Sequence, residues 1–172
     1  MTPTTALHAL SNLLDQIPIR WVLIGALAAN RYRGSPRMTG DIDLLLAGMG
    51  EGLTALEKLL IETDWSVRRA DSEGELLRAT HPEHGTADLL IAGTNYQQLA
   101  IERAISERLG DIDVPVLTPE DVILHKLIAG RFQDLADIES ILETSIELDL
   151  DYLSRWIAAW EVQDLWKRLQ KG

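Results

Sequence analysis

The stretch from Trp21 to Leu46, WVLIGALAANRYRGSPRMTGDIDLLL, decides the fold. An apolar strand ends at Gly25, a short helix and an arginine-rich loop follow, and a second apolar strand opens with Asp41 and Asp43. Because side chains alternate along a strand, the two carboxylates share a face, with Cα atoms roughly 7 Å apart. Such hard oxygen ligands favour Mg²⁺, and a glycine at a strand-to-helix turn lets a phosphate approach the backbone and the helix N-terminus. The stretch therefore indicates chemistry on a nucleoside triphosphate.

Length and composition bound the class of protein. The 172 residues suggest one domain, or a small domain with a helical appendage, with an ordinary globular balance of 46% hydrophobic and 25% charged residues. The lack of cysteine excludes disulfides, thiolate metal sites and cysteine nucleophiles. No apolar run approaches the ~20 residues that span a bilayer, and the N-terminus lacks signal-peptide features, so we expect a cytoplasmic protein without membrane contact. The net charge of −11 argues against broad nucleic-acid binding.

Apolar periodicity and turn residues predict the order of elements. We expect helices over 4–16, 26–32, 53–60 and 96–109, strands over 20–25, 41–47, 65–69, 75–80 and 86–91, and a brief extended piece over 114–116. Thr118 and Pro119 open a helix, because threonine caps and proline suits the first position. The chain is then predicted to be helical almost to its end, with breaks near 130 and 147–149. This pattern indicates an α/β (α+β) core over 1–117, a mixed sheet flanked by helices, and a C-terminal helical region over 118–172 packed on it.

Asp88 is an acid inside the apolar run from Ala87 to Ile91. A lone buried carboxylate is costly, so it needs a cation, a donor or a metal as partner. If its strand neighbours that of Asp41 and Asp43, three carboxylates converge and can hold two Mg²⁺ ions. The alternative is an aspartate at a strand end that pairs with an arginine.

Lys126 lies among apolar and small residues of the helix that begins at Pro119. It either reaches through the helix packing toward the site or lies at the surface with its stem along apolar neighbours. Arg131, Asp134 and Asp137 follow, and acids in the first turn of a helix are also favoured by the helix dipole alone. These residues therefore leave a structural and a functional interpretation open.

Three arginines, Arg31, Arg33 and Arg37, fall just before the Asp pair. One interpretation is a clamp that binds either a triphosphate or an anionic acceptor. The other is a solvated helix end, where the helix dipole favours cations. Asp111 and Asp113 repeat the Asp-Ile-Asp letters after Gly110, but no apolar strand with a glycine turn is expected upstream, so we interpret them as a solvated connection.

A late apolar stripe joins Leu153, Trp156, Ile157 and Trp160 at helical spacing. It favours core or an oligomer interface over a platform for base stacking.

Taken together, these motifs resemble the nucleotidyltransferase superfamily with the DNA polymerase β-type catalytic fold. More narrowly, the chain resembles the AbiEii-type nucleotidyltransferases, toxins of abortive-infection and type IV toxin–antitoxin systems. The superfamily signature is an apolar strand, Gly-Gly or Gly-Ser, a spacer and Asp-hydrophobic-Asp. The matching segments are Ile24-Gly25-Ala26, Arg37-Met38-Thr39-Gly40-Asp41-Ile42-Asp43, Asp88, the pair Lys126 and Arg131, and the pair Asp134 and Asp137, which together span roughly residues 20 to 142.

The resemblance implies Mg²⁺-dependent transfer of a nucleoside monophosphate from an NTP to an acceptor hydroxyl. It implies catalytic roles for Asp41, Asp43, Asp88, Lys126 and Asp134, metal binding by Asp41, Asp43 and Asp88, and nucleotide binding by Gly25, Ala26, Arg37, Thr39 and Arg131. The implied partners are the NTP, an antitoxin protein, and an acceptor that is an RNA end, a protein hydroxyl or a small molecule.

One departure concerns Ala26, which replaces the second Gly or Ser of the signature. An alanine lacks the hydroxyl that could bond a phosphate oxygen, although its backbone N–H remains. The sequence therefore leaves open a catalytically weakened module that binds nucleotide or a partner on the same fold. A metal-dependent phosphohydrolase is a third possibility, because paired carboxylates also serve hydrolysis.

Overall fold

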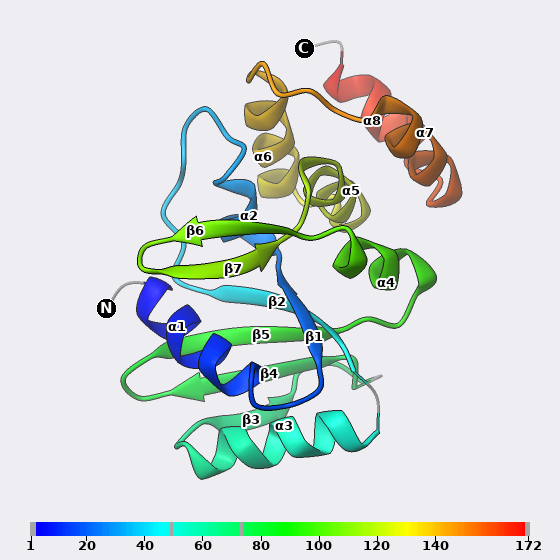
Figure 1. Cartoon of the computed structure of the whole chain (residues 1–172). Helices are drawn as coiled ribbons and strands as arrows, with labels where there is room; N and C mark the ends of the chain where they lie inside the picture. Colours follow the sequence, from blue (N-terminus) through cyan, green and yellow to red (C-terminus); the bar gives the residue numbers. More distant parts are fainter. Residues whose placement is uncertain (1–2, 49, 73, 171–172) are drawn as a thin grey trace.

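The computed structural model describes residues 3–48, 50–72 and 74–170, in which seven strands form one mixed sheet with helices on both faces (Figure 1). The helices are α1 (Pro3–Leu14), α2 (Gly25–Ala29), α3 (Glu51–Glu62), α4 (Asn95–Glu102), α5 (Pro119–Ala129), α6 (Phe132–Leu142), α7 (Leu150–Ala159) and α8 (Gln163–Leu169). The strands are β1 (Arg20–Leu23), β2 (Ile42–Ala47), β3 (Ser66–Arg69), β4 (Leu76–His81), β5 (Gly85–Ile91), β6 (Ile105–Leu109) and β7 (Ile112–Val116). Among these helices, none is long and apolar enough to cross a bilayer.

The strand order β3-β4-β5-β2-β1-β7-β6 places β1 and β2 near the centre of the sheet. These two strands pair antiparallel, β2 runs parallel to β5, and β1 runs parallel to β7. The outer strands are hairpin partners, β3 of β4 and β6 of β7. The mixed sheet flanked by helices, predicted from the sequence, is confirmed.

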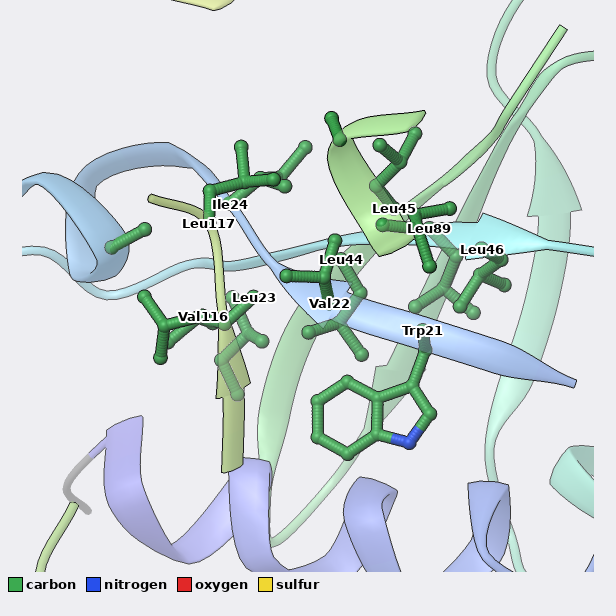
Figure 2. Close-up of a cluster of buried hydrophobic side chains, with 14 of the residues drawn as sticks. Trp21, Val22, Leu23, Ile24, Leu44, Leu45, Leu46, Leu89, Val116 and Leu117 are labelled. Carbon is green, nitrogen blue, oxygen red and sulfur yellow. The ribbon is translucent and has the colours of Figure 1, made fainter. Parts of the chain in front are cut away.

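The central strands are apolar on both faces because helices cover both. Val22 lies opposite Leu45, and Trp21 lies opposite Leu46, so each pair shares one face of the sheet. Figure 2 shows the ring of Trp21 on the side of the blue helix α1, with Leu45 on the opposite side. All four side chains are buried, and each fully buried side chain of this size contributes about 1.5–3 kcal/mol. The same burial explains why this part of the sequence shows no polar alternation.

The predicted helix over 96–109 is wrong in its second half. Helix α4 begins with a capping box between Thr94 and Gln97 and ends at Glu102. The next residues form β6, which pairs with β7 through a two-residue turn in which Gly110 has φ +65°. A positive φ suits such tight hairpins. The ladder to β7 is a contact that the periodicity of residues 96–109 does not report.

The C-terminal region is helical from Pro119, as predicted, with an additional break after α7 near Glu161, whose φ is +56°. A buried hydrogen-bond network fixes this region to the core. The fully buried Asp121 accepts from the Tyr152 hydroxyl at 2.7 Å, from Arg103 Nε at 3.2 Å and from the Thr118 hydroxyl at 2.9 Å. These bonds link α5 to α7 and to the end of α4. The division of the chain at residue 117 stays a prediction.

Candidate active site

A cavity of about 550 Å³ is bounded by β2, β5, the start of α2, and helices α4 to α6. Every site residue predicted from the sequence lines it: Gly25, Ala26, Arg37, Thr39, Asp41, Asp43, Asp88, Lys126, Arg131 and Asp134. The volume suits a small-molecule ligand.

Two carboxylates meet because β2 and β5 are neighbours. Asp43 and Asp88 are register partners on these parallel strands, and Asp41 lies just before β2. Burial, and then the negative charges of Asp88 and Asp41, raise the pKa of Asp43. Within the described residues the Asp43 carboxylate makes no hydrogen bond or ion pair. This concentration of negative charge is an environment that a cation would stabilise.

Asp88 already has a cationic partner. Arg78 on β4 lies opposite it in register and donates from Nε and Nη2 to its two carboxylate oxygens, both at 2.6 Å. The interpretation of Asp88 as an arginine-paired aspartate therefore describes this state of the site. In the part of the chain that the structure describes, no three acidic, histidine or cysteine side chains are grouped closely enough to hold a metal. The oxygen donors Asp41 and Asp43 fit Mg²⁺, whereas Asp88 fits only when Arg78 releases it.

Gly25 packs directly against the Asp43 side chain. Its φ is +67°, and a Cβ at this position would lie 2.0 Å from Asp43 Oδ2. The preceding Ile24 N–H donates to the Asp43 carbonyl at 2.9 Å. The turn after β1 therefore requires glycine both for its backbone conformation and for this close approach, and it brings the backbone of Ala26 to the cavity wall.

A buried charge network lines another part of the cavity, where α5 meets α6. Lys126 Nζ donates to Asp134 Oδ1 at 3.0 Å and to Asp137 Oδ2 at 2.6 Å, and all three side chains are buried. Arg131 Nε donates to Asp134 Oδ2 at 2.6 Å, and Arg37 donates to Asp137 from Nε at 3.0 Å and from Nη2 at 3.2 Å. The interpretation of Lys126 as a surface lysine is wrong.

The acids of this network stay ionised despite their burial. Burial alone raises the pKa values of Asp134 and Asp137, but hydrogen bonds from Arg131 and Lys126 to the first, and from Arg37 and Lys126 to the second, bring both below the ordinary value. Lys126 and Arg131 also lie near enough to Asp43 to lower its pKa. The network therefore holds positive charge next to the carboxylates of the sheet.

The connection between α5 and α6 creates this network. Gly130 ends α5 in the left-handed conformation, with φ +61°, and α6 starts two residues later. A left-handed glycine at the end of a helix lets the chain reverse direction sharply. Lys126 near the end of α5 therefore faces the acids of α6.

Of the three arginines before the Asp pair, Arg37 alone is among the cavity-lining residues described. Arg33 pairs with Asp137 behind the cavity, and Arg31 pairs with Glu107 on β6. The clamp interpretation therefore stays a prediction for Arg37 alone, whereas Arg31 and Arg33 fix the loop to its surroundings.

Sequence reasoning missed several residues of the cavity wall, namely Arg78, Tyr96, Gln97, His125 and Trp160. Arg78 could have been found, because a hairpin centred on Glu83 places it opposite Asp88. The core interpretation of the late stripe is confirmed, because Leu153 and Ile157 are buried in the core and Trp156 and Trp160 pack against it. Trp160 also lines the cavity, which the stripe does not predict.

Comparisons with known proteins agree with this architecture. The chain is similar to a nucleotidyltransferase-like protein from Paracoccidioides brasiliensis, with 18% identity and a TM-score of 0.57 over 98% of this chain and 91% of that one. It is similar to ANT(2")-Ia in complex with adenylyl-2"-tobramycin, with 16% identity and a TM-score of 0.63 over 92% and 97%. It is also similar to the lincosamide antibiotic adenylyltransferase LnuA, with 15% identity and a TM-score of 0.58 over 80% and 94%.

At these identities the structural likeness shows a shared fold. No curated protein sequence matches the chain. A family model, by contrast, matches nearly its whole length, from residue 8 to residue 166. The chain belongs to the family described as nucleotidyl transferase AbiEii toxin of type IV toxin–antitoxin systems.

Proposed function

We propose that the chain transfers a nucleoside monophosphate from an NTP to an acceptor hydroxyl, with Mg²⁺ as cofactor. The acceptor hydroxyl gives up its proton to solvent as its oxygen forms a bond to the α-phosphorus, the bond from that phosphorus to the bridging oxygen of the β-phosphate breaks, and pyrophosphate leaves. In this proposal the activity is that of the toxin in a type IV toxin–antitoxin pair. The observation that carries it is one cavity lined by Asp41 and Asp43, by Gly25, and by the cations of α5 and α6.

Asp41 and Asp43 would hold Mg²⁺, joined by Asp88 when Arg78 exchanges its partner. When bound, Mg²⁺ supplies neutralisation of the charge that develops on the α-phosphate and the leaving pyrophosphate. The Asp43 carboxylate is free of protein partners within the described residues and sits against Gly25, where the backbone is open because no Cβ intervenes. Asp43 is therefore the residue on which the carboxylate side of the site depends most.

Arg37, Lys126 and Arg131 would bind the triphosphate. Charge-assisted hydrogen bonds to phosphate are strong, and the arginine forks suit phosphate oxygens. Asp134 accepts hydrogen bonds from both Lys126 and Arg131, so it holds these two cations side by side. Its catalytic role in this proposal is that of positioning them. Thr39 and the Ala26 backbone N–H would supply the remaining polar contacts to phosphate.

A second function is favoured by one specific observation. Every cation in the cavity wall already pairs with an aspartate: Arg78 with Asp88, Arg37 with Asp137, Arg131 with Asp134, and Lys126 with Asp134 and Asp137. Together with Ala26 in place of Gly or Ser, this satisfied network suits a catalytically weakened module that binds nucleotide or a partner. Such a module would bind Mg²⁺–NTP without transferring the nucleotide.

The experiment incubates the protein with Mg²⁺ and each α-labelled NTP in cell lysate. We expect label in an RNA, a protein or a small molecule, and its loss in an Asp41→Ala/Asp43→Ala variant. The matched control is Asp111→Ala/Asp113→Ala, which removes the same Asp-Ile-Asp letters from an exposed hairpin and should leave labelling unchanged. Release of free nucleoside monophosphate would indicate a phosphohydrolase. Binding of NTP without labelling would favour the weakened module.

A further inference from the structure

Part of the cavity wall carries no charge and is aromatic. Tyr96 on α4, His125 on α5 and Trp160 at the end of α7 all line the cavity, and we call these three residues the aromatic wall. The Tyr96 ring lies 5.5 Å from His125 and 6.1 Å from Trp160, measured between ring centroids. The three side chains therefore form one continuous surface contributed by three helices.

The members of the aromatic wall differ in how deeply they are buried. Tyr96 is 2% exposed, and its hydroxyl donates to the Asp121 carbonyl at 3.4 Å. It supports the wall from behind. Trp160 is only partly buried although it contacts Tyr96. The indole is thus the aromatic surface most available to a ligand.

Two uncharged polar groups accompany the aromatic rings. His125 Nε2 is buried and has no hydrogen-bond partner within the described residues. Burial lowers the pKa of His125 to about 4, so the ring is neutral near pH 7. Gln97 also lines the cavity; its Oε1 accepts from Gly93 N at 2.9 Å and Thr94 N at 3.0 Å, which leaves its Nε2 without a partner in the described chain.

The unpartnered His125 Nε2 points to a ligand, because a buried polar atom without a partner costs free energy that a ligand can recover. The ligand part that fits here is flat, uncharged and edged with donors and acceptors. It is also joined to something anionic, since Lys126, which follows His125 in sequence, lies in the charged network of the same cavity. A nucleobase attached to a triphosphate has all of these properties.

We propose that the aromatic wall is the nucleobase subsite, in which Trp160 stacks on the base while His125 and Gln97 bond its edge. This inference rests on the proposed function and deepens it by assigning the residues that select the NTP. Aromatic side chains stack on any base, and neutral donors and acceptors at its edge discriminate between bases. Trp160 therefore supplies affinity, and His125 and Gln97 supply preference.

The first test measures, by calorimetry and in the presence of Mg²⁺, the binding of two kinds of probe. The first kind is an NTP, with each of the four measured in turn, and the second is inorganic tripolyphosphate. Trp160→Ala should weaken NTP binding by about tenfold or more and leave tripolyphosphate binding unchanged. The matched control is Trp166→Ala on α8, which makes the same chemical change away from the cavity and should affect neither probe. Trp160→Leu, which keeps apolar bulk without stacking, replaces Trp160→Ala if the latter melts early by circular dichroism.

The second test uses His125→Phe, which keeps a flat ring but removes the nitrogens. We expect its preference among the four NTPs to shrink while tripolyphosphate binding stays constant. NTP affinity within twofold of wild type in Trp160→Ala, or equal binding of NTP and tripolyphosphate by the wild type, would overturn the subsite and leave the proposed transfer intact. Loss of transfer in Trp160→Ala with unchanged NTP affinity would assign the wall to the acceptor instead, which also overturns it. A wild-type protein that binds neither probe would overturn the proposed function itself.

Discussion

Asp137 is the residue whose removal should most disturb the buried charge network. It is fully buried and accepts hydrogen bonds from Lys126 Nζ at 2.6 Å, from Arg37 Nε at 3.0 Å and from Arg33. In Asp137→Asn the side chain keeps its shape but loses its charge and one acceptor. Lys126 retains Asp134, whereas both arginines lose their carboxylate.

The size of the effect follows from burial. Breaking a buried ion pair by removing one partner costs about 3–5 kcal/mol. For a chain of 172 residues, where 1 kcal/mol shifts the melting temperature by about 2–4 °C, the expected loss is roughly 6–20 °C. The lost ~3–5 kcal/mol is a large part of the about 5–15 kcal/mol that typically stabilises a domain.

The assay is thermal unfolding by circular dichroism, with urea unfolding as a second measure. The matched control is Asp113→Asn, because Asp113 pairs with Arg108 at 3.0 Å on an exposed hairpin. Exposed pairs contribute about 0–1 kcal/mol, so this variant should melt within about 4 °C of wild type. Equal melting temperatures for Asp137→Asn and Asp113→Asn would refute the claim that the network is a buried structural unit.

Further predictions concern the glycine turn, the arginine beside the sheet and the buried histidine. Gly25→Ala should lower stability by about 1–3 kcal/mol through its positive φ and abolish transfer, whereas Gly40→Ala, with open space at its Cβ, should change neither in the same melts and labelling assay. Arg78→Gln should lower the Mg²⁺ concentration for half-maximal labelling, because it removes the cation that competes with Mg²⁺ for Asp88; an unchanged Mg²⁺ titration would contradict this. Because the folded protein holds the pKa of His125 at about 4, below its ordinary value of 6.5, its contribution to stability is complete above pH 6.5 and is lost as the pH falls toward 4. In urea unfolding across this window, the wild type should lose unfolding free energy relative to His125→Phe as the pH falls, and a constant difference between the two proteins would contradict the assignment.

The sequence predicts the carboxylates, the glycine turn and the lysine of the site well, because their positions follow from short-range rules. Strand alternation predicts that Asp41 and Asp43 point to the same side, and both line the cavity, with Asp43 on β2, Asp41 just before it and Gly25 packed against Asp43. Asp88 meets them because its strand is apolar and therefore central in the sheet. Lys126 reaches the acids of α6 through the reversal at Gly130.

The predictions that fail depend on how strands pair. Arg78 neutralises Asp88 because β4 and β5 pair with these two residues opposite each other, a register that a hairpin centred on Glu83 would have indicated. Residues 105–109 form a strand because β7 offers a partner, against the helical pattern of the preceding residues. Trp160 follows the apolar stripe of α7, but periodicity does not tell which side of the tryptophan remains open to the cavity.

The central claim is that the bond broken lies between the α- and β-phosphates. The most direct measurement supplies purified protein, Mg²⁺ and lysate acceptors with the same NTP labelled either at the α- or at the γ-phosphate. We expect the α-label to enter the acceptor and the γ-label to leave in pyrophosphate, with both events absent in Asp41→Ala/Asp43→Ala. Transfer of the γ-label to the acceptor, or full activity in that variant, would contradict it.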